Sequence, residues 1–182
     1  MLVRYINSMR ILFEEKQRFT QWWLWTILIS VSLMVAGIFI NALYVQLILG
    51  QPWGEMPMSD EGLIAVTLVM ITSIVVTAII VFSSVLEIKV DKMGIGYTFL
   101  PLIRRERRIQ REDIKTFEVK KYSFLRGYGI RYDITGGKTI NVKGNMGIKI
   151  TTHDGKRLML GTQRPDEFFH ALNIMKKGSD DQ

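Results

Sequence analysis

The chain has 182 residues, of which 48% are hydrophobic, and a formal net charge of +7. It contains no cysteine, which excludes disulfide bonds, thiolate zinc sites and cysteine nucleophiles within it. The excess of basic residues favours acidic partners or anionic lipid surfaces.

Residues 1–21 form a basic N-terminal segment. Its apolar residues recur at helical spacing, at Leu2, Tyr5, Ile6, Met9, Leu12 and Phe13. This pattern is typical of an amphipathic helix that lies at a membrane interface on the cytoplasmic side. A second interpretation stays open, in which the segment is a poorly ordered tail that becomes extended near Ile11 to Phe13.

Residues 22–49 and 63–86 are two long apolar stretches without a single charged side chain. A helix needs roughly 20 such residues to cross a bilayer, and both stretches exceed that length. Neither stretch alternates as a barrel strand does, so we expect two helices. The sequence therefore predicts a two-helix transmembrane hairpin over 22–86 with an external loop over 50–61. The first stretch is also far longer than the apolar part of a cleavable signal peptide.

Charge and aromatic residues predict the orientation of this hairpin. The loop carries Glu55, Asp60 and Glu61 but no lysine or arginine, whereas all basic residues lie before 22 or after 86. Because basic residues near spans stay on the cytoplasmic side, both termini are expected there. The second span leads almost directly into the next segment, so the domain that follows should lie against the bilayer. The predicted membrane-interface anchors are Trp22, Trp23, Trp25 and Tyr44.

Residues 87–177 change to a hydrophobic period of two, as at Ile88 and Val90 or at Phe117 and Val119. Turn signals such as Asp154–Gly155 separate the segments. The final segment returns to helical spacing after Pro165, with an apolar stripe at Phe168, Ala171, Leu172 and Met175. We therefore expect an α+β membrane protein whose soluble part is an antiparallel sandwich or barrel of about seven strands, closed by a C-terminal amphipathic helix. A polar tail follows at 178–182.

Several stretches of the chain resemble bacterial two-span membrane proteins that carry a cytoplasmic pleckstrin-homology-like (PH-like) domain. The matching stretches are Phe13–Phe19, Gln21–Trp25, Gly129–Tyr132, Asn141–Asn145 with Gly147–Ile148, and Asp154–Arg157 leading to Gly161–Pro165. The resemblance covers nearly all of the chain after Ile11 and implies a multi-pass protein of the bacterial inner membrane. Its motifs are structural, so it implies no catalytic residue. Residues 1–10 extend beyond the pattern.

A run of five arginines between residues 104 and 111 is the sharpest candidate for a binding site. Arginine pairs well with phosphate, so this run predicts contact with anionic lipid headgroups or with a partner. The other interpretation is a solvated strand face that enforces membrane topology. A nearby loop, 122–128, mixes aromatic and basic residues and either contacts the membrane or a partner, or folds over the core. The candidate binding residues are Arg104, Arg105, Arg107, Arg108, Arg111, Phe124 and Arg126.

The sequence offers no positive signal for catalysis. His153 and His170 have no second ligand at metal-binding spacing, and the Gly144–Gly147 turn lacks the strand-to-helix context of a phosphate loop. No ionisable group lies at the centre of either span, which weighs against a transporter. We expect a non-enzymatic module without metal, cofactor or nucleic-acid partner, which binds the bilayer and a protein partner or a second copy of itself. The alternatives are recognition of anionic lipid by the basic strand and, more remotely, an enzyme or transporter component.

Overall fold

The computed structural model describes residues 11–122, 127–132 and 137–177. These residues form two compact units, each described by itself. One unit is the helical hairpin, Gln21–Phe82, and the other is a strand-rich domain built from the residues on both sides of it. The hairpin is therefore inserted into the domain's sequence rather than placed before it.

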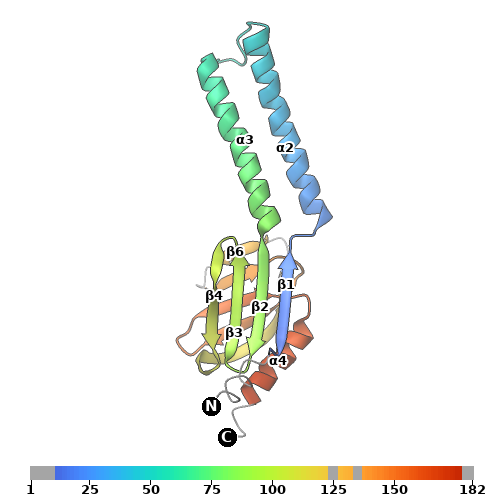
Figure 1. Cartoon of the computed structure of the whole chain (residues 1–182), viewed down its shortest axis with the longest axis vertical. Coiled ribbons are helices and arrows are strands. Elements are labelled where there is room, and N and C mark those ends of the chain that lie inside the picture. The colour runs from blue at the N-terminus through green and yellow to red at the C-terminus, as the bar shows by residue number, and fades with distance from the viewer. Residues whose placement is uncertain (1–10, 123–126, 133–136, 178–182) are drawn as a thin grey trace. The chain divides into compact units, whose positions relative to one another are not determined.

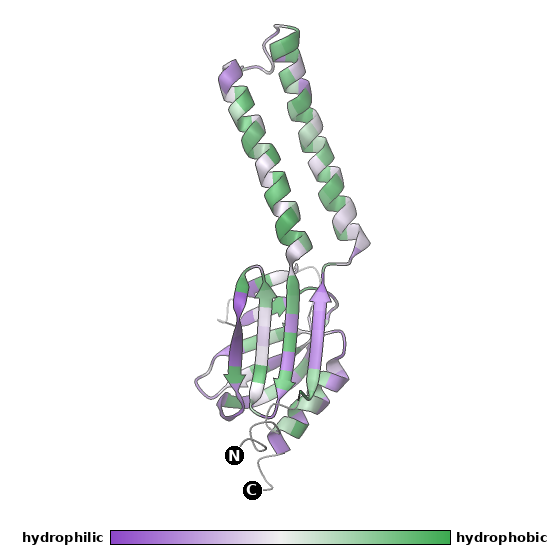
Figure 2. Cartoon of the chain, in the orientation of Figure 1, coloured by the Kyte–Doolittle hydropathy of each residue, from purple (hydrophilic) through white to green (hydrophobic). Residues whose placement is uncertain are grey.

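The hairpin contains two helices that are long and apolar enough to cross a membrane. Helix α2 (Trp22–Leu43) continues as a π-helical turn, η1 (Tyr44–Ile48), and helix α3 spans Asp60–Ser83. Only 6% of the most apolar window of each helix is buried, unlike the core helix of a soluble protein. Figure 2 shows both helices as predominantly hydrophobic along their length.

The second helix lies three residues earlier than the sequence predicted. It starts at Asp60, inside the expected loop, because Asp60 and Glu61 complement the positive end of the helix dipole. Gln46 stabilises this end of the hairpin, since its Nε2 donates to Met58 O at 2.8 Å and to Asp60 Oδ1 at 2.7 Å. At the other end the helix stops at Ser83, and Ser84 alone separates it from the next strand.

The strand-rich domain consists of two sheets, the coarse arrangement that the alternation predicted. The four-stranded sheet has the order β1-β2-β3-β4, and all its neighbours are antiparallel. Its strands are β1 (Phe13–Arg18), β2 (Val85–Asp91), β3 (Gly94–Leu100) and β4 (Ile103–Gln110). The four strands run side by side in Figure 1.

The five-stranded sheet has the order β5-β8-β9-β7-β6, in which only β7 and β9 are parallel. A 3-10 turn, η2 (Arg111–Asp113), leads into it from β4. Its strands are β5 (Ile114–Lys121), β6 (Gly129–Tyr132), β7 (Lys138–Asn141), β8 (Met146–Thr152) and β9 (Arg157–Gly161). The described part of the chain thus holds nine strands, where about seven were expected.

Strand β1 is the main departure from the sequence prediction. The interfacial helix proposed for the N-terminal segment is wrong for Phe13–Arg18, which is extended and pairs with β2 over its whole length. Opposite charges face each other across this pair: Lys89 Nζ lies 3.7 Å from Glu14 Oε1, and Lys16 Nζ lies 3.4 Å from Glu87 Oε1. Cross-strand pairs of opposite charge stabilise one register over its neighbours. Residues 1–10 lie outside the described residues.

The core lies between the two sheets and the terminal helix α4 (Pro165–Lys177). Helix α4 packs mainly against β1, β2, β5 and β8 and buries the predicted stripe Phe168, Ala171, Leu172 and Met175. The rings of Phe168 and Phe13 stack with centroids 4.9 Å apart. The segment before the hairpin therefore contributes directly to the core of the domain that follows it.

Candidate functional site

Strand β4 carries four of the predicted arginines and lies at an edge of the four-stranded sheet. Its side chains from Arg104 to Arg108 are all exposed, and Figure 2 shows the strand as largely hydrophilic. Only Ile103 and Ile109 are partly buried against the core. An edge strand presents unpaired backbone donors and acceptors, and basic side chains there prevent indiscriminate pairing. The same features suit an acidic extended partner.

The arginines of this run differ in how far they are neutralised. Arg108 forms an ion pair with Asp91, and Arg111 Nε lies 3.6 Å from Glu112 Oε1. Arg104 donates from Nε to Pro101 O at 3.3 Å. Within the described part of the chain, Arg105 and Arg107 form no ion pair. The positive charge of β4 that no described ion pair compensates therefore lies at Arg104, Arg105 and Arg107.

The remaining predicted site residues fall into two groups. Phe124 and Arg126 lie outside the described residues. Trp22 and Trp23 are exposed at the start of α2, and Trp25 contacts Phe82 edge-on with ring centroids 6.3 Å apart. Tyr44 is exposed at the start of the π-helical turn. Aromatic side chains thus occur toward both ends of the hairpin, as interface anchors do.

A buried polar group on β1 has no counterpart in the sequence prediction. Glu15 is only 6% exposed, and its carboxylate accepts hydrogen bonds from the Thr162 hydroxyl and from Gln163 N at 3.0 Å. Gln17 is 1% exposed and donates from Nε2 to Gly161 O at 2.7 Å. These bonds join β1 to the segment that links β9 to α4. The alternation of Glu15 and Gln17 is the available signal, but the helical spacing of the apolar residues before them favours an interfacial helix.

Beside these bonds lies a second polar cluster on the five-stranded sheet. Arg131 Nη2 donates to Asn141 Oδ1 at 3.4 Å, and Tyr122 extends its hydroxyl toward Gly161. Burial raises the pKa of Tyr122, and the nearby Asn141 side chain lowers it to a smaller extent. The Tyr122 hydroxyl nevertheless makes no well-aligned hydrogen bond within the described region. Buried side-chain atoms without a partner in the described region include Gln17 Oε1, Tyr122 OH, Arg131 Nε and Nη1, and Asn141 Nδ2.

The described residues offer no side-chain cluster typical of a metal centre. They contain no group of three or more histidine or acidic side chains that could hold a metal ion. His170 lines a shallow groove of about 340 Å³ between β1 and α4, together with Leu12, Arg164 and Ile174. His153 lies in the turn between β8 and β9, where its backbone N donates to Asp113 O at 2.9 Å.

Comparison with known proteins does not identify a family for this chain. The chain matches no protein-family model, no curated protein and no solved structure. The function is therefore inferred from the two apolar helices, the topology of the domain and the distribution of its charges.

Proposed function

We propose that the chain is a membrane-anchored interaction module of the bacterial inner membrane, with a PH-like domain and both termini in the cytoplasm. The apolar helices and the acidic, lysine- and arginine-free loop support this placement. The pairing of Arg18 with Val85 supports the part of this placement that puts both ends of the hairpin on one side of the bilayer, whichever side that is. Two sheets with a C-terminal helix support the PH-like assignment, although β1 and the parallel β7–β9 pair go beyond the seven-strand pattern.

The module binds an acidic protein segment along β4. The observation that carries this proposal is the free edge of β4, where Arg105 and Arg107 are exposed and form no described ion pair. An extended acidic segment would add a fifth strand through backbone hydrogen bonds and place carboxylates opposite the arginines. Pairing of β4 with β4 of a second copy would instead oppose arginine to arginine, which disfavours self-assembly at this edge.

Site-specific photo-crosslinking in native membranes tests this function. A photoreactive amino acid at Glu106, in the middle of β4, should give a crosslinked product from the full chain, and the R105E/R107E variant should lose it. The matched control is K115E/K120E, which makes the same charge change at exposed positions of β5. A missing product, or one that survives R105E/R107E, would contradict the proposal. A product of twice the chain's 21.0 kDa would assign the edge to self-assembly instead.

Anionic lipid headgroups are the second candidate ligand of the same strand. The observation in its favour is the position of Arg104 and Arg105 at the start of β4, next to the turn that follows Leu100, the residue paired with Val85. Native mass spectrometry of the full chain should then detect retained phosphatidylglycerol that R104Q/R105Q loses. Equal retention of phosphatidylcholine and phosphatidylglycerol would remove this candidate.

A further inference from the structure

The strand register assigns every turn of the domain to one of two ends. Arg18 pairs with Val85, and Val85 pairs with Leu100, so the β3–β4 turn lies at the end where the chain enters and leaves the hairpin. Gln17 bonds to Gly161 O, and Lys143 Nζ lies 3.1 Å from Thr20 Oγ1, which brings the β7–β8 turn to this same end. We call it the hairpin-side end and the opposite one the far end.

Exposed apolar side chains occur at the hairpin-side end in the β3–β4 turn. Leu102 is 64% exposed and Leu100 39% exposed, with Pro101 between them. Both leucines lie outside the core cluster of the domain. Exposed leucine side chains on a turn are unfavourable in water. Their transfer to the boundary between lipid headgroups and acyl chains lowers the free energy.

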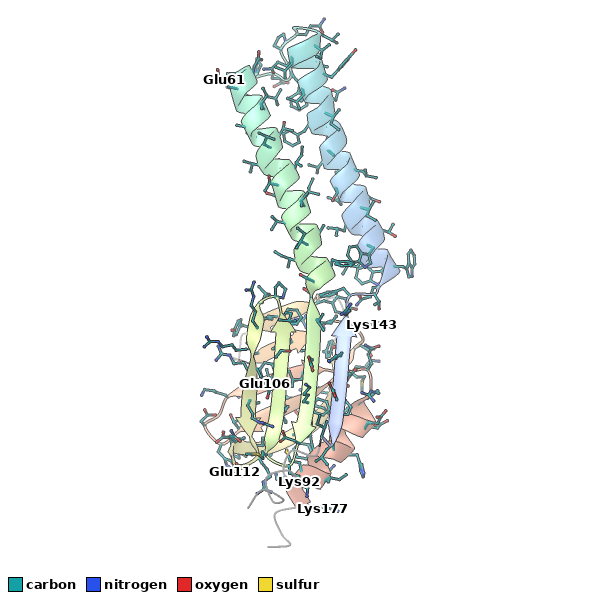
Figure 3. The ribbon with its side chains drawn as sticks, in the orientation of Figure 1. Glu61, Lys92, Glu106, Glu112, Lys143 and Lys177 are labelled. Atoms are coloured by element: carbon teal, nitrogen blue, oxygen red, sulfur yellow. The ribbon has the colours of Figure 1, made fainter. Side chains whose placement is uncertain are left out.

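The charges of the domain are divided between its two ends. The charged side chains in the described turns of the hairpin-side end, and within two residues of the strand ends there, are all basic: Arg18, Arg104, Lys120, Lys121 and Lys143. The far end carries both signs, including Asp91, Glu112, Asp113 and Asp154 beside Lys92 and Lys156. Figure 3 shows Lys143 at one end of the domain and Lys92, Glu112 and Lys177 at the other, with Glu106 between.

We propose that the hairpin-side end of the domain docks on the anionic cytoplasmic leaflet, with Leu100 and Leu102 inserted at headgroup depth and the basic side chains around them. Three residues separate Arg18 from α2 and Ser84 alone separates α3 from β2, so the tethers keep this end within reach of lipid. Basic residues near an anionic surface and an inserted apolar turn are the two contributions that hold peripheral domains on membranes. This inference depends on the proposed cytoplasmic placement but not on partner binding by β4.

Depth measurements on the full chain test the docking directly. Because the chain lacks cysteine, a single L102C variant can carry an environment-sensitive fluorophore, and M93C is the matched control. Met93 is also an exposed apolar turn residue, but it lies at the far end. In nanodiscs containing phosphatidylglycerol, the probe at position 102 should emit at shorter wavelength and be quenched by lipid-borne quenchers, while the probe at position 93 should remain aqueous.

Charge variants then separate electrostatic docking from simple proximity. R18Q/K121Q/K143Q, which leaves β4 unchanged, should lower the ratio of docked to undocked domain by about fivefold for each charge removed. K92Q/K115Q/K177Q removes the same charge elsewhere and should leave that ratio unchanged. An aqueous probe at position 102 in every lipid composition, or equal effects of the two triple variants, would overturn the proposal. Neither result would affect crosslinking from β4, so a failure here is distinct from a failure of the proposed partner site.

Discussion

Arg18 and Val85 lie directly opposite each other in the antiparallel pair of β1 and β2, although the whole hairpin separates them in sequence. The helical hairpin therefore occupies the position of an ordinary turn between two neighbouring strands. Each of its two connections enters the same sheet, so the domain is held by two adjacent strands rather than by one flexible linker. This arrangement makes the residues before the first helix part of the fold.

Replacement of residues 19–84 by Asn-Gly should yield a soluble, cooperatively folded domain, because this dipeptide forms the two-residue turn that joins antiparallel strands. A fragment that starts at Val85 lacks β1 and should be much less stable, since loss of Phe13 alone costs about 3 kcal/mol. Urea unfolding of the two shortened proteins measures the difference. Equal stability would show that β1 is dispensable.

Substitution of Glu15 by alanine should lower the free energy of unfolding by about 2 kcal/mol, because the buried Thr162 hydroxyl and Gln163 N–H lose their acceptor. The neighbouring Glu14→Ala variant removes an exposed carboxylate and should change it by less than about 1 kcal/mol. Thermal unfolding of the full chain in detergent compares them. Equally small losses of thermal stability in the two variants would contradict a stabilising role for the buried Glu15 carboxylate.

Substitution of Gly161 by alanine should destabilise the domain by about 2 kcal/mol, because the added Cβ would lie 2.7 Å from both Asn141 Cβ and Tyr122 OH. The control is Gly96→Ala, whose Cβ would lie nearest to the flexible side chain of Glu106. That variant should cost less than about 1 kcal/mol. The ranking of the two unfolding midpoints is the measurement, and a reversed ranking would contradict the packing of Tyr122.

Glu87 should contribute to the acid sensitivity of the domain. Lys89, with a smaller effect from Lys16, holds the pKa of Glu87 below its ordinary value of 4.5. A lowered folded-state pKa means that this stabilisation is present above pH 4.5 and is lost as the pH falls through the folded-state pKa. Glu87→Gln should therefore destabilise the domain at pH 7 by less than about 1 kcal/mol and reduce the loss between pH 7 and pH 3. An unchanged loss would exclude this role.

The sequence predicts those features that depend on local pattern. The length and polarity of the two apolar stretches predicted both helices, and alternation located most strands, including those around Ile88 and Ile148. One interpretation had the chain extended near Phe13, but the rest of β1 escaped prediction. Its inward positions hold Glu15 and Gln17, whose burial depends on partners far away in sequence at Thr162 and Gly161. Local hydrophobicity cannot report a polar side chain that a distant segment will satisfy.

The candidate site likewise combines features that local sequence predicts with features that depend on distant parts of the chain. The arginine run predicted an exposed strand, and β4 is exposed. Its position at the sheet edge, and the ion pair that neutralises Arg108 with Asp91, follow from topology and cross-strand register. The cross-strand pairing of Gly147 with Gly161, beside which Tyr122 lies, likewise requires the register of β8 and β9.

Accessibility of single cysteines in intact bacterial cells tests the membrane topology most directly. Met56 lies in the hairpin loop and is 94% exposed, whereas Arg105 lies on β4 of the strand-rich domain. A membrane-impermeant maleimide should label M56C in intact cells and R105C only after the inner membrane has been permeabilised. Labelling of R105C in intact cells, with M56C protected, would contradict a cytoplasmic domain anchored by a two-helix hairpin.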